Sequence, residues 1–565
     1  MLNSITYSLP PELQTAVRTS LENWQKENKI SRIWSKDSSV WTGEDEAKWL
    51  GWLDIVDEEL GNVPAFNDFR EDIKISGFSD VLLMGMGGSS LCPEVLGMTF
   101  GVKNFHILDS TVPARIKAIE DQIDIAKTLF IVASKSGSTL EPNCFKQYFF
   151  DKVSQVNGSD NAGKQFVAIT DPGSKMQKVA EADGFRHIFF GKPEIGGRFS
   201  ALSAFGLAAA SSMGIDVERL LTVANEMVAA CKTGHPGENP GAMLGSVLGT
   251  AQRSGRDMLT IFTSPEIHDL GAWLEQLIAE STGKSGIAII PVDREPMQSA
   301  SEYSNDRVFV YLTLKNGTSG DEVYYNLEEI ERLGHPLVRI ELESIYHIAQ
   351  EFFRWEFATA VAGSVMEINP FNQPDVEAAK IEARKLTDGY EQNGSLPPET
   401  PFFEAEGFQV FTGEKYTAEL TAEAGDKNVK DFLNAHLRQI KEHDYFALLA
   451  YIEMSEANEK LLQQIREKVL SRTGVATCLG FGPRFLHSTG QAYKGGPNSG
   501  VFLQITSDDE FDLPVPDQKY TFGVVKSAQA RGDFQVLLDR GRRALRVHFG
   551  TNVAEGLEQL LAAVA

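Results

Sequence analysis

Short apolar runs alternate with longer amphipathic stretches along most of this chain. From about residue 76, five of these runs have the length and composition of buried strands, at residues 80–84, 104–108, 129–133, 166–170 and 187–190. The segments between them carry helical patterns of apolar and polar positions. Because strands that alternate with helices build a parallel sheet with helices on both faces, we predict an α/β domain in this part of the chain.

A second alternating series begins near residue 258 and predicts a further α/β unit. Strands are expected at residues 258–262, 307–314 and 336–342. A long apolar helix is expected from Ile345 to Ile368, and Pro370 interrupts the helical pattern before it resumes at Val376. The chain shows no internal sequence repeat, so the two series suggest a duplication of structure alone.

The two ends of the chain differ from this alternating middle. Residues 1–60 hold five of the seven tryptophans and predict a helical segment that packs onto the main body. Residues 388–403 are rich in glycine, proline and polar side chains and predict a linker or a long surface loop. Strands are expected beyond this stretch at residues 445–452, 475–480, 500–506 and 544–549. We therefore divide the chain into an N-terminal helical segment (1–60), a first domain (61–235) and a second domain (236–565) with an inserted or permuted tail from about residue 388.

A glycine-rich turn follows the first predicted strand. Residues 85–90 read Gly-Met-Gly-Gly-Ser-Ser, and a helical pattern opens at Pro93. Glycines let backbone N–H groups approach a ligand closely, and a helix N-terminus adds partial positive charge. Such turns hold nucleotides, phosphates or nothing, so this turn alone leaves the phosphate and purely structural interpretations about equal.

A second polar loop follows another predicted strand, residues 129–133. It carries Lys135 and four hydroxyl residues, Ser134, Ser136, Ser138 and Thr139. Ligands collect at the carboxyl ends of parallel strands, so two such loops in one α/β unit argue against a solvated turn. Several neutral donors and one fixed positive charge suit a phosphate group. The two loops together predict a phosphate site.

The composition narrows the classes of partner and compartment. The 565 residues include 53 Lys and Arg against 78 Asp and Glu, a net charge of −25, which disfavours nucleic acid and anionic membranes. The four cysteines are widely spaced, which indicates a reducing compartment with neither a disulfide framework nor a zinc site. The sequence has no signal-peptide pattern and no apolar run of about 18 residues that could span a bilayer. We expect a soluble cytoplasmic protein.

Five motifs resemble, in order, the signatures of the glucose-6-phosphate isomerase family. They are residues 85–89 (GMGGS), 134–139 (SKSGST), 196–200 (GGRFS), 280–284 (ESTGK) and 373–380 (QPDVEAAK), and the resemblance covers roughly residues 60–390. Residues 32–37 (RIWSKD) and the long tail are most similar to the isomerase half of bacterial transaldolase–glucose-6-phosphate isomerase fusions. We recognise no transaldolase half in this chain.

The resemblance implies an α/β fold of two sugar isomerase (SIS) domains, each a parallel sheet flanked by helices, with the active site between them. It also implies an enzyme of glycolysis and gluconeogenesis that interconverts glucose 6-phosphate and fructose 6-phosphate through a cis-enediol(ate). The family needs no metal or cofactor, and its usual homodimer borrows an active-site histidine from the partner subunit. Its partner molecule is a sugar phosphate.

The family's roles can be carried over motif by motif. Glu280 matches the base, Arg198 the partner of the enediolate, and Gln373 and Lys380 the remaining pair of the site. The sugar phosphate would be held by Gly88, Ser89, Ser134, Ser136 and Thr139, with Lys135 beside them. This set suits the chemistry, because one carboxylate over C1 and C2 can move the proton between them and a guanidinium stabilises the enediolate. Phosphate binding far from these carbons positions them under the base.

The family histidine is not where the resemblance expects it. His335 and His347 lie between the Glu280 and Gln373 motifs, but neither has the family surroundings, and we interpret both as structural. His487 is followed by Gln491 and by a glycine-rich turn into an apolar strand, which resembles the family's histidine segment. We infer that this segment has moved into the tail, where His487 opens the sugar ring with Lys380 as its companion.

Two alternatives stay open at this point. A non-catalytic sugar-phosphate-binding regulator with SIS domains needs only the phosphate loops, so the retained Arg198, Glu280, Gln373 and Lys380 argue against it. An isomerase of a related sugar, such as mannose 6-phosphate or a sulfonated sugar, would keep the same residues. The stereochemistry of the hydroxyl groups is recognised by the shape of the pocket, which these motifs do not reveal.

Overall fold

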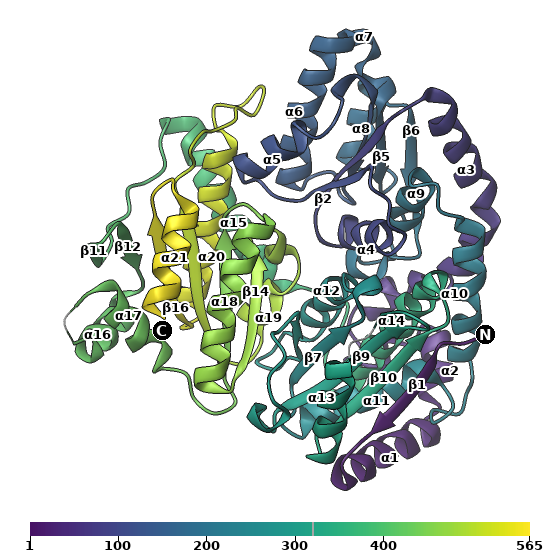
Figure 1. The fold of residues 1–565 in the computed structure, drawn as a ribbon. Coiled ribbons are helices and arrows are strands. Elements are labelled where there is room, and N and C mark those ends of the chain that lie inside the picture. Colours follow the sequence, from purple (N-terminus) through teal and green to yellow (C-terminus); the bar gives the residue numbers. More distant parts are fainter. Residues whose placement is uncertain (319–320, 426, 565) are drawn as a thin grey trace.

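The computed structural model describes residues 1–318, 321–425 and 427–564, and these residues form three sheets flanked by helices (Figure 1). The first sheet has the strand order β3-β2-β4-β5-β6, the second β1-β10-β9-β7-β8, and the third β11-β12-β16-β15-β13-β14. Among the described residues, no helix has both the length and the apolar character needed to cross a membrane.

The first sheet is fully parallel and confirms the strands predicted for this part of the chain. Its strands are β2 (Asp80–Gly85), β3 (Phe105–Leu108), β4 (Thr128–Ala133), β5 (Phe166–Thr170) and β6 (His187–Phe190). Alternate residues of β4 enter two different apolar cores, Leu129 and Ile131 on one face and Phe130 and Val132 on the other. A strand buried on both faces reads as a continuous apolar run, which is why this one was predictable. The helices of this part are α4 (Leu91–Thr99), α5 (Pro113–Glu120), α6 (Leu140–Asn157), α7 (Ser159–Ala162), α8 (Lys175–Ala182) and α9 (Ala204–Ser212).

The second sheet is parallel except for one edge strand. Its parallel strands are β7 (Met258–Thr263), β8 (Ile290–Asp293), β9 (Arg307–Leu314) and β10 (Leu337–Leu342). The edge strand β1 (Ser4–Ser8) pairs antiparallel with β10, although the sequence was expected to be helical there. The sequence Ser-Ile-Thr-Tyr-Ser has too few apolar residues to signal a strand, and its pairing partner lies more than 300 residues away. The helices are α10 (Val217–Cys231), α11 (Pro240–Arg253), α12 (Leu270–Thr282), α13 (Asp321–Arg332) and α14 (Ile348–Val365).

The N-terminal segment continues in helices that tryptophans fasten to the body. Its helices are α1 (Pro11–Lys26), α2 (Lys29–Trp34) and α3 (Ile55–Ser76). Trp52 is fully buried, and its ring lies 5.3 Å from the ring of Phe199. Trp41 donates a hydrogen bond of 2.7 Å through Nε1 to the carbonyl of Ala360. These contacts attach the segment beside the loop that carries Arg198.

The tail builds the third sheet, and its four predicted strands are confirmed as β13 (Tyr445–Tyr451), β14 (Ala476–Phe481), β15 (Gly500–Ser507) and β16 (Arg543–Phe549). These four are parallel, and β11 (Phe403–Ala405) and β12 (Phe408–Phe411) add an antiparallel edge. The predicted linker is shorter than expected, because helix α15 (Pro374–Asn393) continues past Asp388. Gly394 caps the end of this helix. The tail's own helices are α16 (Glu414–Glu423), α17 (Val429–Leu437), α18 (Glu456–Thr473), α19 (Gly490–Gly495), α20 (Phe522–Asp539) and α21 (Val553–Ala563).

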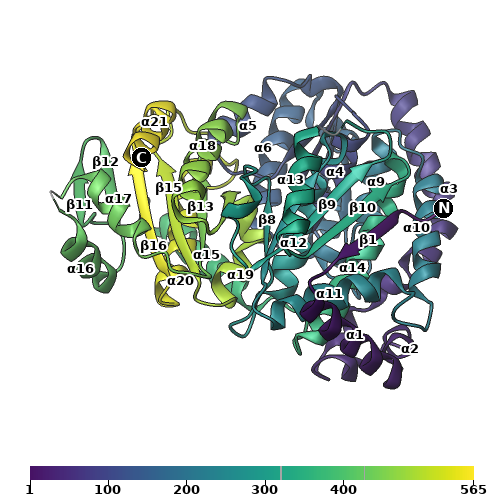
Figure 2. The ribbon, with the colours of Figure 1, turned by 60° about the horizontal axis from the view of Figure 1, so that its bottom comes forward.

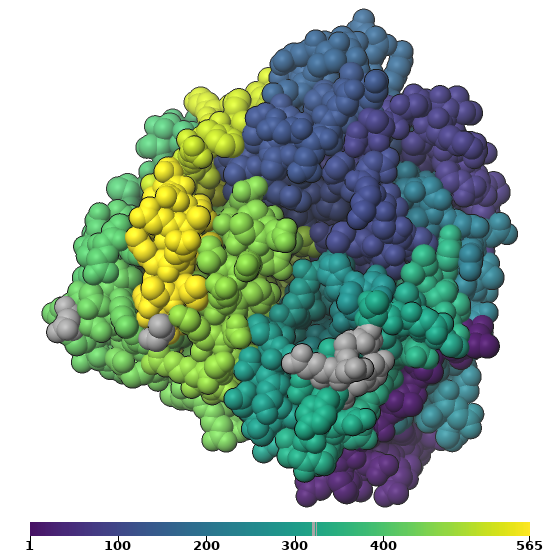
Figure 3. Space-filling model, in the orientation of Figure 1, coloured from purple at the N-terminus to yellow at the C-terminus, as the bar shows by residue number. Residues whose placement is uncertain are grey.

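The third sheet is covered by helices on both faces. Figure 2 shows α18 and α21 on one face and α15, α19 and α20 on the other. Helices α15 and α20 approach closely at Gly532, where a Cβ atom would lie 2.7 Å from the backbone nitrogen of Ala383. The tail also packs directly against the first domain (Figure 3), where Arg484 forms an ion pair with Glu94. We retain the division into residues 1–60, 61–235 and 236–565 as a proposal, with the third sheet as the displaced tail of the last part from about residue 388.

Candidate active site

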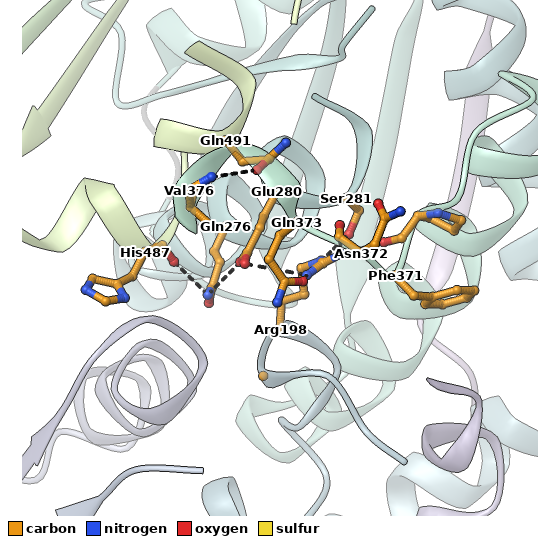
Figure 4. Close-up of polar contacts among 12 residues, drawn as sticks. Arg198, Gln276, Glu280, Ser281, Phe371, Asn372, Gln373, Val376, His487 and Gln491 are labelled. Atoms are coloured by element: carbon orange, nitrogen blue, oxygen red, sulfur yellow. Dashed lines mark hydrogen bonds and ion pairs between the residues drawn. The ribbon is translucent and has the colours of Figure 1, made fainter. Parts of the chain in front are cut away.

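Arg198 lies in the short helical turn Gly197–Phe199, between strand β6 of the first sheet and helix α9. Its side chain is buried, and its Nε donates to Ser281 Oγ at 2.7 Å. The two terminal nitrogens donate to Gln373 Oε1 at 2.8 Å and to the carbonyl of Pro370 at 2.7 Å (Figure 4). Burial lowers the pKa of Arg198 and Glu280 opposes this, but a guanidinium stays charged in proteins. Arg198 therefore places a fixed positive charge between the two domains.

Glu280 lies on α12 and faces this guanidinium. Its Oε1 is 3.5 Å from Arg198 Nη1, and the residue is only 8% exposed. One helical turn earlier, Gln276 donates through Nε2 to Glu280 Oε2 at 3.1 Å and to the carbonyl of His487 at 2.8 Å. Figure 4 shows Gln276 between Glu280 and His487. A buried carboxylate with a fixed cation and a positioned amide can accept and return a proton in a defined place.

The glycine-rich turn permits the close approach of two loops. Gly87 has φ +55°, a conformation that favours glycine, and Gly88 lies so near Gly197 that a Cβ atom would be 2.0 Å from the Gly197 carbonyl oxygen. The turn therefore packs directly on the loop that carries Arg198. Ser89 is half-buried at the end of this turn, just before α4.

The hydroxyl-rich loop opens onto a cavity of about 350 Å³. Ser136, Ser138 and Thr139 line this cavity, and the Oγ atoms of Ser136 and Ser138 are 2.7 Å apart. Ser134 is buried beneath the loop, and its Oγ has no hydrogen-bond partner among the described residues. These hydroxyls provide the neutral donors that an anionic group requires.

Lys135 points away from this cavity. Its Nζ forms an ion pair with Asp171 and donates to the carbonyl of Lys192 at 2.8 Å. Asp171 directly follows the neighbouring strand β5, so its carboxylate pairs with the positive charge of the Lys135 ammonium group there. The expectation that Lys135 lies beside the phosphate stays a prediction, since the ion pair with Asp171 does not test it. Lys135 anchors the loop in this structure.

His487 comes from the tail and reaches the first domain. Its Nε2 lies 2.8 Å from Oε1 of Glu141, a buried residue in the first turn of α6. Burial works to raise the pKa of Glu141, but the adjacent His487, a backbone hydrogen bond and Lys380 together outweigh burial, and the pKa lies below its ordinary value. His487 and Glu141 both line the 350 Å³ cavity. Glu141 was not predicted from the sequence, because a carboxylate in the first turn of a helix is ordinary.

Lys380 and Gln373 come from the start of α15. Lys380 lines the same cavity, and its Nζ lies 2.9 Å from Glu377 Oε1. Gln373 is exposed and bonded to Arg198. Gln491 of the tail accepts hydrogen bonds from the backbone nitrogens of Asp375 and Val376, at 2.9 Å and 3.1 Å, which caps this helix. The tail therefore helps to position the residues of the Gln373–Lys380 motif.

The two other candidate histidines lie elsewhere. His335 is buried against the ring of Phe309, and His347 Nδ1 is 2.8 Å from Ser344 Oγ. Burial lowers the pKa of both histidines. Neither is among the residues that line the 350 Å³ cavity. Within the described part of the chain, no three His, Cys, Asp or Glu side chains are grouped so that they could hold a metal ion.

Parallel α/β domains, hydroxyl-rich loops at strand ends and a buried carboxylate–guanidinium pair define the class of sugar-phosphate isomerases. The phosphoglucose isomerase family profile matches residues 72–301. A probable glucose-6-phosphate isomerase of Methanococcus maripaludis is 27% identical over 380 residues, 60% of this chain and 84% of that protein. A glucose-6-phosphate isomerase of Gloeothece citriformis is 30% identical over 358 residues, 55% of this chain and 66% of that protein. Residues 72–301 of this chain are thus similar to the glucose-6-phosphate isomerase family, and both of these relatives carry that name.

Two solved structures share the fold. A hypothetical protein from Thermus thermophilus matches with a TM-score of 0.56 and 24% sequence identity, covering 67% of this chain and 99% of that chain. A glucose-6-phosphate isomerase from Chlamydia trachomatis matches with a TM-score of 0.50 and 20% identity, covering 65% of this chain and 78% of that chain. Identities this low are evidence of fold alone, and they confirm the predicted α/β class.

Proposed function

We propose that this chain is an aldose–ketose isomerase that interconverts glucose 6-phosphate and fructose 6-phosphate through a cis-enediol(ate). The buried pair of Glu280 and Arg198, 3.5 Å apart, is the observation that carries this proposal. The similarity of this chain to the glucose-6-phosphate isomerase family supports the same reaction. The reaction belongs to both glycolysis and gluconeogenesis.

In this proposal Glu280 moves the proton between C2 and C1. The hydrogen bond from Gln276 and the nearby Arg198 fix the carboxylate in one orientation, so it can serve both carbons. Arg198 stabilises the negative charge that develops on the enediolate oxygens, because it is a permanent cation in a site shielded from water. Gln373, which Arg198 holds, contacts the same part of the sugar.

Ring opening is assigned to His487, with Glu141 behind it and Lys380 across the cavity. The ring oxygen needs a proton before the C1–O bond can break, and an imidazole that titrates near neutrality suits this step. Glu141 holds the imidazole in place through Nε2. Lys380 lines the same cavity and can donate to the same region of the sugar.

The phosphate group is assigned to the two loops at the strand ends. Gly88 and Ser89 would contribute backbone and hydroxyl donors, and Ser136 and Thr139 would contribute hydroxyls from the cavity wall. Ser134 would contribute its unpaired buried hydroxyl. Lys135, whose ammonium group pairs with Asp171, would lie beside these donors.

The finer assignments belong to the same proposal. Residues 32–37 and the tail support a particular kinship with the isomerase halves of transaldolase fusions. The family resemblance supports a homodimer, and the composition supports a cytoplasmic protein. His487 comes from the same chain as Glu280, so the proposed site needs no histidine from a partner subunit.

A coupled assay on the purified protein tests the function. Fructose 6-phosphate is supplied, and glucose 6-phosphate is detected with a dehydrogenase, with mannose 6-phosphate and sulfoquinovose as competing substrates. We expect the highest kcat/KM for the glucose 6-phosphate and fructose 6-phosphate pair. Binding of these sugars without turnover would instead support the regulator, and faster turnover of another sugar would reassign the substrate.

A further inference from the structure

Gln529 of α20 contacts the proposed ring-opening pair and belongs to none of the family motifs. It is 3% exposed and lines the 350 Å³ cavity. Its Nε2 donates to Glu141 Oε1 at 2.6 Å, the same carboxylate oxygen that lies 2.8 Å from His487 Nε2. Its Oε1 accepts a hydrogen bond of 2.7 Å from Thr111, a fully buried residue of the first domain. A continuous chain of hydrogen bonds thus connects Thr111, Gln529, Glu141 and His487.

Chemistry fixes the orientation of the Gln529 amide. Glu141 is an acceptor when ionised, so the amide must turn its NH₂ group toward the carboxylate. The opposite orientation would place two oxygen acceptors against each other at 2.6 Å. The Thr111 hydroxyl then donates to the amide oxygen, which satisfies both ends of the Gln529 side chain.

We propose that Gln529 is a positioning residue for ring opening, which shares the Glu141 carboxylate oxygen with His487 and so fixes the imidazole toward the sugar. This inference rests on the proposed function. A carboxylate oxygen that accepts two hydrogen bonds is less free to rotate and holds each donor less strongly than a carboxylate with one donor. Without Gln529, Glu141 can rotate about its side chain and draw the imidazole out of line with the ring oxygen.

Several other groups act on this pair, so a pH profile alone would not isolate Gln529. Lys380 of α15 interacts with Glu141, and Asp109 at the end of β3 interacts with His487. Tyr451 at the end of β13 and Cys144 of α6 also lie close enough to interact with Glu141. A comparison of two substrates separates ring opening from proton transfer without titrating these groups.

The test is Gln529→Met, which keeps the side-chain length and removes both hydrogen bonds. We expect kcat/KM for cyclic glucose 6-phosphate to fall about tenfold, a part of what general acid catalysis provides. Exchange of the C1 proton of 5-deoxyfructose 6-phosphate, which lacks the hydroxyl that closes the ring, should stay at the wild-type rate. Gln535→Met is the matched control, because Gln535 is an exposed residue of the same helix. It should leave both reactions unchanged.

Thr111→Val provides a second variant that leaves Gln529 in place. It removes the hydrogen bond that orients the amide, and we expect a smaller fall confined to the cyclic substrate. Equal losses on both substrates, or no loss on the cyclic one, in either folded variant would overturn the inference. If Gln529→Met fails to fold, Thr111→Val decides by the same criterion. A wild-type protein without isomerase activity would refute the proposed function itself, which separates that failure from this one.

Discussion

Glu280 has three features of a single catalytic base. It is almost fully buried, it lies 3.5 Å from a permanent cation, and its second oxygen accepts a hydrogen bond from Gln276. Arg198 also donates hydrogen bonds through Nη2 to the carbonyls of Pro370 and Asn372, in the loop before α15. The base and the enediolate partner are therefore held by the same interactions that join α12 to α15.

Glu280→Gln should nearly abolish isomerisation while binding of a non-reacting sugar phosphate stays close to wild type. The amide keeps the shape of the side chain and removes the basic oxygen, so a loss of about a thousandfold or more in kcat is expected. Stopped assays give kcat and calorimetry gives the affinity for sorbitol 6-phosphate. Glu328→Gln, at an exposed position of α13, controls for the loss of one negative charge. Retention of a tenth of the wild-type rate would contradict this role.

At the residue scale, the sequence identified the side chains that sit within motifs and missed those brought in by folding. Arg198 and Glu280 lie in short, distinctive segments and are in contact as expected. Glu141 and Gln529 are separated by almost 400 residues and meet only because α20 packs against α6. Lys135 belongs to a motif, yet its contact with Asp171 depends on the neighbouring strand. Sequence motifs therefore indicated which residues are present, whereas their orientation depended on tertiary contacts.

Two glycines in the same pair of loops differ in the space around them, since Gly88 is in close contact and Gly196 is not. Gly88 leaves no room for a side chain, because a Cβ atom would lie 2.0 Å from the Gly197 carbonyl. Gly196 lies in the opposing loop with no described atom within 4 Å of its Cβ position, and its φ of −65° suits any residue. The contact between the two loops thus depends on Gly88 and not on glycine content in general.

Gly88→Ala should destabilise the protein by about 1–3 kcal/mol, because the added methyl group forces the two loops apart. It should also lower kcat, since the displaced loop carries Arg198. Gly196→Ala should leave both the free energy of unfolding and kcat near wild-type values. Urea unfolding and the coupled assay measure the two quantities. Similar behaviour of the two variants would show that the loops do not pack as described.

Charged side chains also gather where α12 and β8 meet the tail. Glu275 and Asp293 line a cavity of about 90 Å³ together with Arg294, Arg466 and Arg484. Burial, and then the neighbouring Asp293, raise the pKa of Glu275 above its ordinary value. An acid with a raised pKa binds more protons in the folded than in the unfolded chain, so stability falls as the pH rises from the ordinary to the raised value. This junction should therefore weaken on the alkaline side.

Glu275→Gln should stabilise the protein at about pH 8 and change it little at about pH 5, because the amide removes the cost of ionisation. Thermal melting of both proteins at the two pH values measures the difference. The wild-type melting temperature should fall more steeply with pH than that of the variant. A variant that is less stable at about pH 8 would show that Arg294 and Arg466 hold Glu275 ionised and stabilise it.

At the scale of elements, apolar runs predicted the central strands because those strands are buried on both faces. The edge strand β1 was missed, since its polar residues leave only a weak pattern and its stability comes from pairing with β10. The end of α15 was also missed. The last turns of α15, up to Asn393, are rich in polar residues, so the sequence shows no clear helical pattern there. The helix packs against α20, which supports its helical form.

At the scale of the whole molecule, the tail is a third α/β unit that contributes residues to the candidate site. It contributes His487 and Gln529 to the cavity, caps α15 through Gln491, and is joined to the first domain through Arg484 and Glu94. The sequence predicted its four parallel strands individually. That they form a sheet of their own was not predictable, because strand pairing across a hundred residues leaves no trace in local patterns.

The same arrangement bears on whether subunits share active sites. In this chain Gln276 bonds both to Glu280 and to the His487 carbonyl, so the proposed base and the proposed ring-opening histidine lie near each other within one chain. If both residues act within the same chain, each chain of a mixed dimer lacks one of them, so neither active site is complete. If His487 instead served a neighbouring subunit, a mixed dimer of two inactive variants would rebuild one complete site.

Co-expression of Glu280→Gln and His487→Ala chains with different affinity tags distinguishes these cases. We expect each variant alone to be nearly inactive on cyclic glucose 6-phosphate, the first because the base is absent and the second because the ring stays closed. Purification through both tags isolates any mixed dimers, and their activity should not exceed the residual activity of the parents. A mixture of two differently tagged wild-type chains, purified in the same way, gives the full rate for comparison. Recovery of a large fraction of that rate would place His487 in the partner's site, and would make the contact between His487 and Glu141 an exchange between subunits.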